Sequence, residues 1–154
     1  MHQSIYTKII NYNTCSKFHQ PNAIVIHTAL DSRSVPGGSK IQTKAKGRAV
    51  LHIKNNYEFF IQLDVYNIQN VTMAHIHFVN EKTPTENGPV LLWLYKTKEP
   101  LKMFNGSLVS RTFTLADLQK RMNLTEFKNY IHTCKLYYNV HTVQNPNGEL
   151  AGEL

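Results

Sequence analysis

The chain has 154 residues, of which 42% are hydrophobic and 18% are charged. This length suits a single domain with its own core, and the composition excludes a largely disordered chain. No stretch approaches the ~18 consecutive apolar residues of a membrane-spanning helix. Residues 1–17 show no apolar segment typical of a secretory signal. The formal charge of +7 favours anionic partners, although solubility alone also accounts for it.

The first 22 residues are polar, and we interpret them as a tail or an added edge strand preceding a domain over residues 23–154. The two cysteines, Cys15 and Cys134, lie far apart in the sequence and form no C-x-x-C pair. This spacing excludes a zinc ribbon and a disulfide-dense scaffold. A bridge between the tail and the domain and a pair of free thiols both remain open, depending on the compartment.

The first half of the domain alternates between apolar and polar residues. Residues 23–30 are rich in β-branched side chains and predict a strand, followed by a Pro- and Gly-containing loop over 31–39. Residues 44–53 and 57–65 each have apolar residues at every second position, which is typical of half-buried strands. The Asn55-Asn56 pair between them predicts a hairpin turn.

The second half continues in the same manner, with one helical interruption. Thr114 with Asp117 resembles a capping box and predicts a helix over residues 115–122, and a shorter helix is expected over 126–130. Many short strands separated by turns predict an all-β, antiparallel Greek-key sandwich or barrel with one or two short helices. The further strands are expected at residues 71–79, 90–96, 106–112, 135–142 and 149–154.

Several motifs occur in the order found in one known family. They are TMAHIH at 72–77, ENGPV at 86–90, TLADL at 114–118, YNVHT at 138–142 and NPNGELAGEL at 145–154. Together they resemble the chordin-domain (CHRD) family over residues 23–154. The resemblance implies an immunoglobulin-like or Cu/Zn superoxide dismutase-like β-sandwich, found in proteins that are often extracellular or at the cell surface. It implies no general biochemical activity.

Three of the eight histidines have a spacing that indicates a site. His75 and His77 are two residues apart on a predicted strand, so both side chains lie on the same face. Ala74 and Ile76 lie on the opposite face, which suits the core. His141 lies on another predicted strand and also points away from the core. If the two strands are neighbours, about 4.8 Å apart, the three imidazoles converge on the outer side of the sandwich.

Three neutral imidazoles with an open fourth position suit copper or zinc. The arrangement is similar to the copper ligands of superoxide dismutases, and Glu149 is a candidate acceptor for an imidazole N–H. An alternative is that His75, His77 and His141 form hydrogen bonds that tether a covering loop, residues 80–89, to the sheet.

A basic stripe is the other candidate binding feature. Such a stripe contacts phosphates or sulfates in some proteins, and in others it is a solvated strand face that discourages edge-to-edge pairing. The stripe consists of Lys40, Lys44, Lys46 and Arg48.

The sequence thus supports three hypotheses of different classes. The first is a non-enzymatic CHRD-type binding or structural module, outside the cell or at its surface, that recognises an anionic surface or a protein. The second is a copper enzyme with superoxide dismutase-like chemistry, which uses the same histidines and a basic approach for an anionic substrate. The third is self-assembly into a homo-oligomer, with the tail over residues 1–22 added as a strand to a neighbour.

Overall fold

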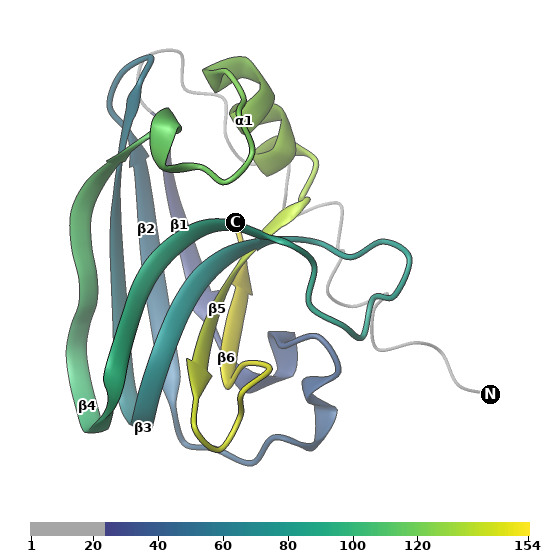
Figure 1. The fold of residues 1–154 in the computed structure, drawn as a ribbon. Helices are drawn as coiled ribbons and strands as arrows, with labels where there is room; N and C mark the ends of the chain where they lie inside the picture. The colour runs from purple at the N-terminus through teal and green to yellow at the C-terminus, as the bar shows by residue number, and fades with distance from the viewer. Residues whose placement is uncertain (1–23) are drawn as a thin grey trace.

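The computed structural model describes residues 24–154, which form one antiparallel sheet of six strands with one short α-helix (Figure 1). The all-β fold predicted from the sequence is therefore confirmed. The strands are β1 (Ile24–Leu30), β2 (Lys46–Ile53), β3 (Glu58–Phe78), β4 (Val90–Thr114), β5 (Leu136–Thr142) and β6 (Leu150–Glu153). The helix is α1 (Leu124–His132), and 3-10 turns occur at Ser32–Ser34, Gly38–Lys40 and Leu115–Asp117.

The sheet curls until it nearly closes into a barrel. Its strands run in the order β1-β2-β3-β5-β6, and β4 pairs with β3 outside this path. At the closing edge, Asp31 and Ala151 form an isolated bridge between the ends of the path. The Thr28 hydroxyl also donates to the Glu153 carbonyl at 2.9 Å. The curled sheet encloses the hydrophobic core, and the long β3 connects its two halves (Figure 1).

The predicted hairpin around Asn55 joins β2 to β3. The Asn55 side-chain oxygen accepts hydrogen bonds from the backbone N–H groups of Tyr57 and Glu58, at 2.8 and 2.9 Å. An asparagine that bonds backbone two or three residues ahead stabilises a tight turn. The alternation after the turn is also confirmed, because Phe59 and Ile61 are buried in the core.

β3 is longer than the sequence predicts, because the strands expected at 57–65 and 71–79 are one continuous strand. Asn67 and Asn70 lie in the gap between them and both have a φ of 54°. Asparagine tolerates this left-handed conformation better than most residues do, so the strand bends without ending. The strands expected at 90–96 and 106–112 likewise merge into β4, which pairs with β3 along its length.

The helix prediction over 115–122 is wrong, because only the 3-10 turn Leu115–Asp117 forms there. The Gln119 backbone N–H instead donates to the Leu91 carbonyl at 2.8 Å, which draws the chain onto the sheet. The α-helix begins after Asn123, whose side chain accepts from the Glu126 N–H while the Glu126 carboxylate accepts from the Asn123 N–H. This reciprocal capping box fixes the start of α1.

Two predictions concern residues that lie outside the described part of the chain. The N-terminal tail over residues 1–22 is one, and the state of Cys15 is the other. Cys134 is described and is buried just after α1. Within residues 24–154, no helix is long and apolar enough to cross a membrane.

Candidate metal centre

His75 and His77 lie near the end of β3 and share one face of the sheet. The alternating residues Ala74 and Ile76 are fully buried in the core, so the two imidazoles point to the opposite face. This confirms the predicted orientation of the His-x-His pair.

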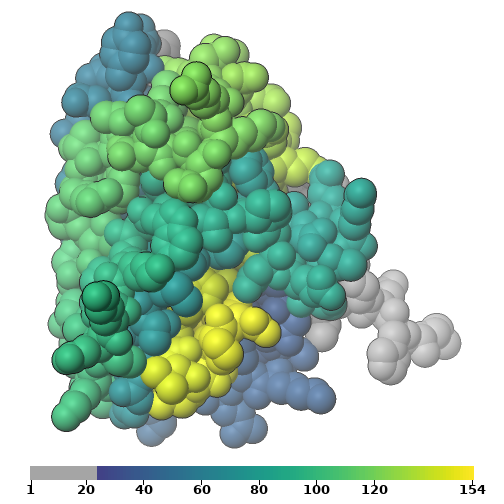
Figure 2. Space-filling view, viewed as in Figure 1, coloured from purple at the N-terminus to yellow at the C-terminus, as the bar shows by residue number. Residues whose placement is uncertain are grey.

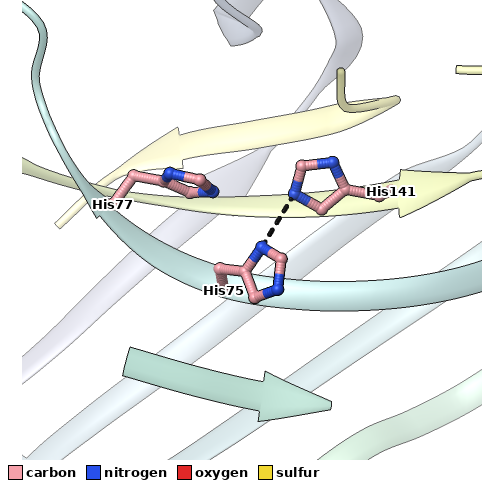
Figure 3. A group of neighbouring side chains, drawn as sticks. All are labelled: His75, His77 and His141. Atoms are coloured by element: carbon pink, nitrogen blue, oxygen red, sulfur yellow. Dashed lines mark hydrogen bonds between the residues drawn. The ribbon is translucent and has the colours of Figure 1, made fainter. Parts of the chain in front are cut away.

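β5 brings His141 to the same face. In the antiparallel register, His75 pairs with Asn139 and His77 with Tyr137, while His141 lies opposite Met73. The three imidazoles therefore face one another across the two strands (Figure 3). The shortest approach is 3.1 Å, between His75 Nδ1 and His141 Nε2. One possible donor atom from each ring lies within 4.8 Å of the other two, so the predicted convergence occurs.

The three imidazoles are covered, although they lie on the side of the sheet away from the core. Each histidine is only 4% exposed. The β3–β4 loop covers His77, whose Nδ1 lies 2.8 Å from the Gly88 carbonyl. The β5–β6 loop covers His141, whose Nδ1 lies 2.9 Å from the Pro146 carbonyl. The site is therefore an enclosed cluster between the sheet and two loops.

The two covering loops also contact each other. The Asn87 amide donates to the Asn147 carbonyl at 2.7 Å, and Figure 2 shows the yellow C-terminal segment against the teal segment on this face. Asn139, on β5 beneath them, donates to both Asn87 and Asn147 at 3.0 and 3.1 Å. The two loops and the sheet thus form one connected cover over the site.

Two glycines allow the loops to lie so close to the sheet. A Cβ at Gly88 would collide with the Phe78 carbonyl. A Cβ at Gly148 would collide with the Asn139 side chain, and Gly148 also has a φ of 123° that disfavours any other residue. Gly88 is therefore required to place its carbonyl against His77.

The hydrogen bonds define which ring nitrogens carry protons. A carbonyl only accepts, so Nδ1 of His77 and Nδ1 of His141 are both N–H donors. Nε2 of each ring is then left with a lone pair, and His141 Nε2 accepts from His75 Nδ1. Two buried ring nitrogens, Nε2 of His75 and Nε2 of His77, have no hydrogen-bond partner in the described part of the chain.

Burial keeps the cluster neutral. Desolvation, together with the neighbouring His141 and His77, lowers the pKa of His75 to about 3. Desolvation also lowers the pKa of His141 to about 4 and that of His77 below its usual value. Because a metal ion binds the unprotonated imidazole, these rings are in the ligating form at neutral pH.

The donor set fits the metals that the sequence indicates. Imidazole nitrogen is a good ligand for copper and zinc, and in many metal sites the other ring N–H of the ligand donates to a backbone carbonyl. His77 and His141 already make that orienting contact through Nδ1. The lone pair of His77 Nε2 is buried and unpaired, which is the state that a metal ion would relieve.

Glu149 is buried, but it does not accept from an imidazole. Its carboxylate accepts from the Thr43 and Thr142 hydroxyls, at 2.6 and 2.7 Å, and from the Asn145 amide at 3.0 Å. The backbone carbonyls of Gly88 and Pro146 take the role predicted for it. Glu149 instead anchors the β5–β6 loop to β5 and to the segment before β2.

The predicted basic stripe is exposed. Arg48 forms an ion pair with the buried Asp64, with 3.0 Å between Nε and the carboxylate oxygen, so part of its charge is compensated. Lys46 also lies on β2, whereas Lys40 belongs to the Gly38–Lys40 turn. Anion binding by Lys40, Lys44, Lys46 and Arg48 stays a prediction.

Two aromatic side chains beside the site were not predicted as part of it. The Trp93 ring lies edge-on to His75 with 4.2 Å between ring centroids, and Trp93 is 38% exposed. The Tyr137 ring stacks on His77 at 5.3 Å. Tyr137 and His141 lie an even number of positions apart on β5, so their side chains share one face. The sequence alternation could therefore have placed Tyr137 beside the histidines.

Comparison with protein-family models finds a match to the CHRD domain over residues 26–154. The curated proteins and the solved structures contain no match to the chain. The matched segment contains all six strands except the first residues of β1, together with the three histidines. The chain therefore belongs to the CHRD domain family.

Proposed function

We propose that this CHRD domain is a non-enzymatic binding module that holds one transition-metal ion, copper or zinc, between His75, His77 and His141. The observation that carries the proposal is His77 Nε2, a buried lone pair with no partner. An unpartnered buried polar atom of this kind costs about 1–3 kcal/mol. A metal ion bound to it would remove that cost.

The tethering of loops explains only part of the arrangement. It accounts for the Nδ1 atoms of His77 and His141, which bond the carbonyls of the two covering loops. It does not explain why three imidazoles face one another, because a single hydrogen bond joins them. Since a histidine has two ring nitrogens, tethering through one is compatible with metal binding through the other.

His75 adopts a different orientation from its two neighbours. In Figure 3, the ring nitrogen of His75 that bonds His141 faces the other two rings, and the second nitrogen points away. His75 Nδ1 is therefore the atom placed to ligate, together with Nε2 of His77 and of His141. The proton on His75 would then reside on Nε2, where the Trp93 ring, 4.2 Å away between centroids, can accept a weak hydrogen bond.

The burial of the cluster favours holding a metal ion over transforming a substrate. Each imidazole is 4% exposed beneath two linked loops. A bound ion would join β3, β5 and both loops, and it would stabilise the fold because the unfolded chain lacks the site. The ion supplies this cross-link, and the three imidazoles supply the ligands.

The test is a titration of the untagged, metal-free protein with Cu(II) and with Zn(II), followed by elemental analysis. We expect one equivalent to bind and the melting temperature to rise. The variant with His75, His77 and His141 all replaced by alanine should bind none. His27→Ala, at an exposed histidine on β1, is the matched control and should bind as the wild type does. Binding of one equivalent by the triple variant, or none by the wild type, would refute the proposal.

A further inference from the structure

A β-bulge lies next to the histidine cluster on β3. Val71 pairs with Thr142 and Met73 pairs with His141, so Thr72 is an extra residue between two consecutive pairs. The Thr72 hydroxyl donates to the His141 carbonyl at 3.2 Å. Bulges of this kind change the direction of the side chains that follow them.

The bulge places Val71 and Met73 on opposite faces of the sheet, and Met73 lies on the face of the histidines. Val71 and Ala74 are both fully buried in the core, which strict alternation would not allow. After the bulge, Met73, His75 and His77 alternate with the core residues and share one face. Met73 is half-buried and, among the residues described, is not one of the side chains that pack against the core.

The register places Met73 beside two of the three imidazoles. It is directly opposite His141 and two residues before His75. Directly opposed residues of an antiparallel pair have Cβ atoms about 4.5–5.5 Å apart. The unbranched methionine side chain has three rotatable bonds and adapts to irregular spaces. Met73 is therefore the sulfur-containing residue that neighbours His75 and His141 on this face.

The charges around the site favour an ion of low charge. All three imidazoles are neutral ligands, and among residues 24–154 no hydrogen bond joins one of them to a carboxylate. The Lys96 ammonium lies 5.0 Å from the Trp93 ring centroid, and that ring contacts His75. The cost of burying an ion rises with the square of its charge, so a monovalent ion costs about a quarter as much as a divalent one.

Resting on the proposed function, we propose that Met73 supplies a thioether ligand to the same ion and that the site prefers Cu(I) to Zn(II). Thioether sulfur is a soft ligand that selects Cu(I), whereas zinc sites use nitrogen, oxygen and thiolate ligands. A three-histidine, one-methionine set without an anionic ligand suits a monovalent copper ion in a buried site.

The test compares metal affinities of metal-free variants. Cu(I) is titrated under anaerobic conditions against a chromophoric Cu(I) chelator, and Zn(II) against a zinc-binding dye. Met73→Leu preserves volume and apolarity, and it should weaken Cu(I) binding about tenfold or more while leaving Zn(II) binding unchanged. The matched control is Met103→Leu, at an exposed methionine on β4, which should change neither affinity. X-ray absorption should detect sulfur bound to copper in the wild type and not in Met73→Leu.

Each contrary outcome removes a specific part of the account. Equal Cu(I) affinity of the wild type and Met73→Leu, with no sulfur at the copper, overturns the role of Met73. Tighter binding of Zn(II) than of Cu(I) by the wild type overturns the preference and leaves the metal site standing. Absence of binding of both ions by the wild type overturns the proposed function itself. The unchanged Zn(II) affinity of Met73→Leu serves as the check that this variant folds.

Discussion

His75 Nδ1 lies 3.1 Å from His141 Nε2, although the two residues are 66 positions apart in the sequence. This contact joins β3 to β5 on the face away from the core, beneath the loops that follow each strand. Both atoms are ligand atoms in the proposed site, and in the metal-free protein they share one proton. Metal binding must therefore displace the proton from His75 Nδ1.

The single tryptophan of the chain provides an intrinsic probe of the site. Trp93 lies 4.2 Å from the His75 ring, between centroids. Because Cu(II) is paramagnetic and quenches nearby fluorophores, one equivalent should strongly quench the Trp93 emission, and Zn(II) should quench it much less. The emission is recorded during titration of the metal-free protein. Equal quenching of the wild type and of the variant lacking all three histidines would show that copper binds elsewhere.

The stability of the metal-free protein should decrease as the pH falls below about 6.5. Burial holds the pKa of His75 at about 3 and that of His141 at about 4 in the folded state, compared with 6.5 for an ordinary histidine. Below pH 6.5 the unfolded chain binds protons that the folded chain does not, so unfolding becomes more favourable as the pH drops toward 3. Above 6.5 this contribution is constant.

The urea midpoint, measured between pH 8 and pH 4.5, checks this dependence. The lowered pKa values of the Asp31 and Asp64 carboxyls contribute mainly at lower pH. Replacing His75 and His141 with asparagine should flatten the profile between pH 6.5 and 4.5, whereas His27→Asn should not. A variant lacking His75 and His141 whose profile is as steep as that of the wild type would contradict the assigned burial of the neutral rings.

Gly88→Ala should loosen the cover of the site. The new Cβ would collide with the Phe78 carbonyl, and relief of that collision moves the Gly88 carbonyl away from His77. We expect a loss of about 1–3 kcal/mol in the free energy of unfolding, together with faster release of bound metal to a chelator. Thr85→Ala, at an exposed position of the same loop, is the control. Unchanged stability and release in Gly88→Ala would argue against a close-fitting loop.

Glu149→Gln separates the structural role of this residue from a role in metal binding. The Glu149 carboxylate accepts three hydrogen bonds, from two threonine hydroxyls and the Asn145 amide. The NH₂ group of a glutamine would replace one acceptor oxygen by a donor that faces these donors. The free energy of unfolding should decrease by about 1–3 kcal/mol, and the protein should still bind one equivalent of metal. The exposed Glu86→Gln serves as control in thermal melts. Loss of binding with unchanged stability would restore Glu149 as a partner of the imidazoles.

The sequence predicts the face of the sheet and one covering loop, residues 80–89, but not the second loop, which covers His141. Because side chains alternate between the two faces of a strand, the sequence places His75 and His77 on the face opposite the core. The same alternation on β5 places His141 on that face. The covering carbonyls, Gly88 O and Pro146 O, belong to loops whose paths depend on contacts between distant residues. Glu149 was the only side-chain acceptor that the residue types suggested, and it bonds elsewhere.

The errors in the predicted elements have similar physical causes. β3 continues through Asn67 and Asn70 because its long pairing with β4 outweighs the local preference of asparagine for turns. The helix expected after Thr114 is prevented by the Gln119 bond to the strand residue Leu91. The bulge at Thr72 shifts the alternation by one residue, so Val71 is buried in the core although it has the parity of His75. Met73, two residues before His75, has the parity of the histidine face, and the sequence pattern contained that signal.

The most direct test of the metal site is the long-range ¹H–¹⁵N spectrum of the imidazoles, recorded without metal and with one equivalent of Zn(II). The account predicts that His77 and His141 keep their proton on Nδ1 in both states, with Nε2 shifting on binding. It predicts that His75 moves its proton from Nδ1 to Nε2. Imidazole nitrogens that stay unshifted in the presence of one equivalent would contradict metal binding at this cluster.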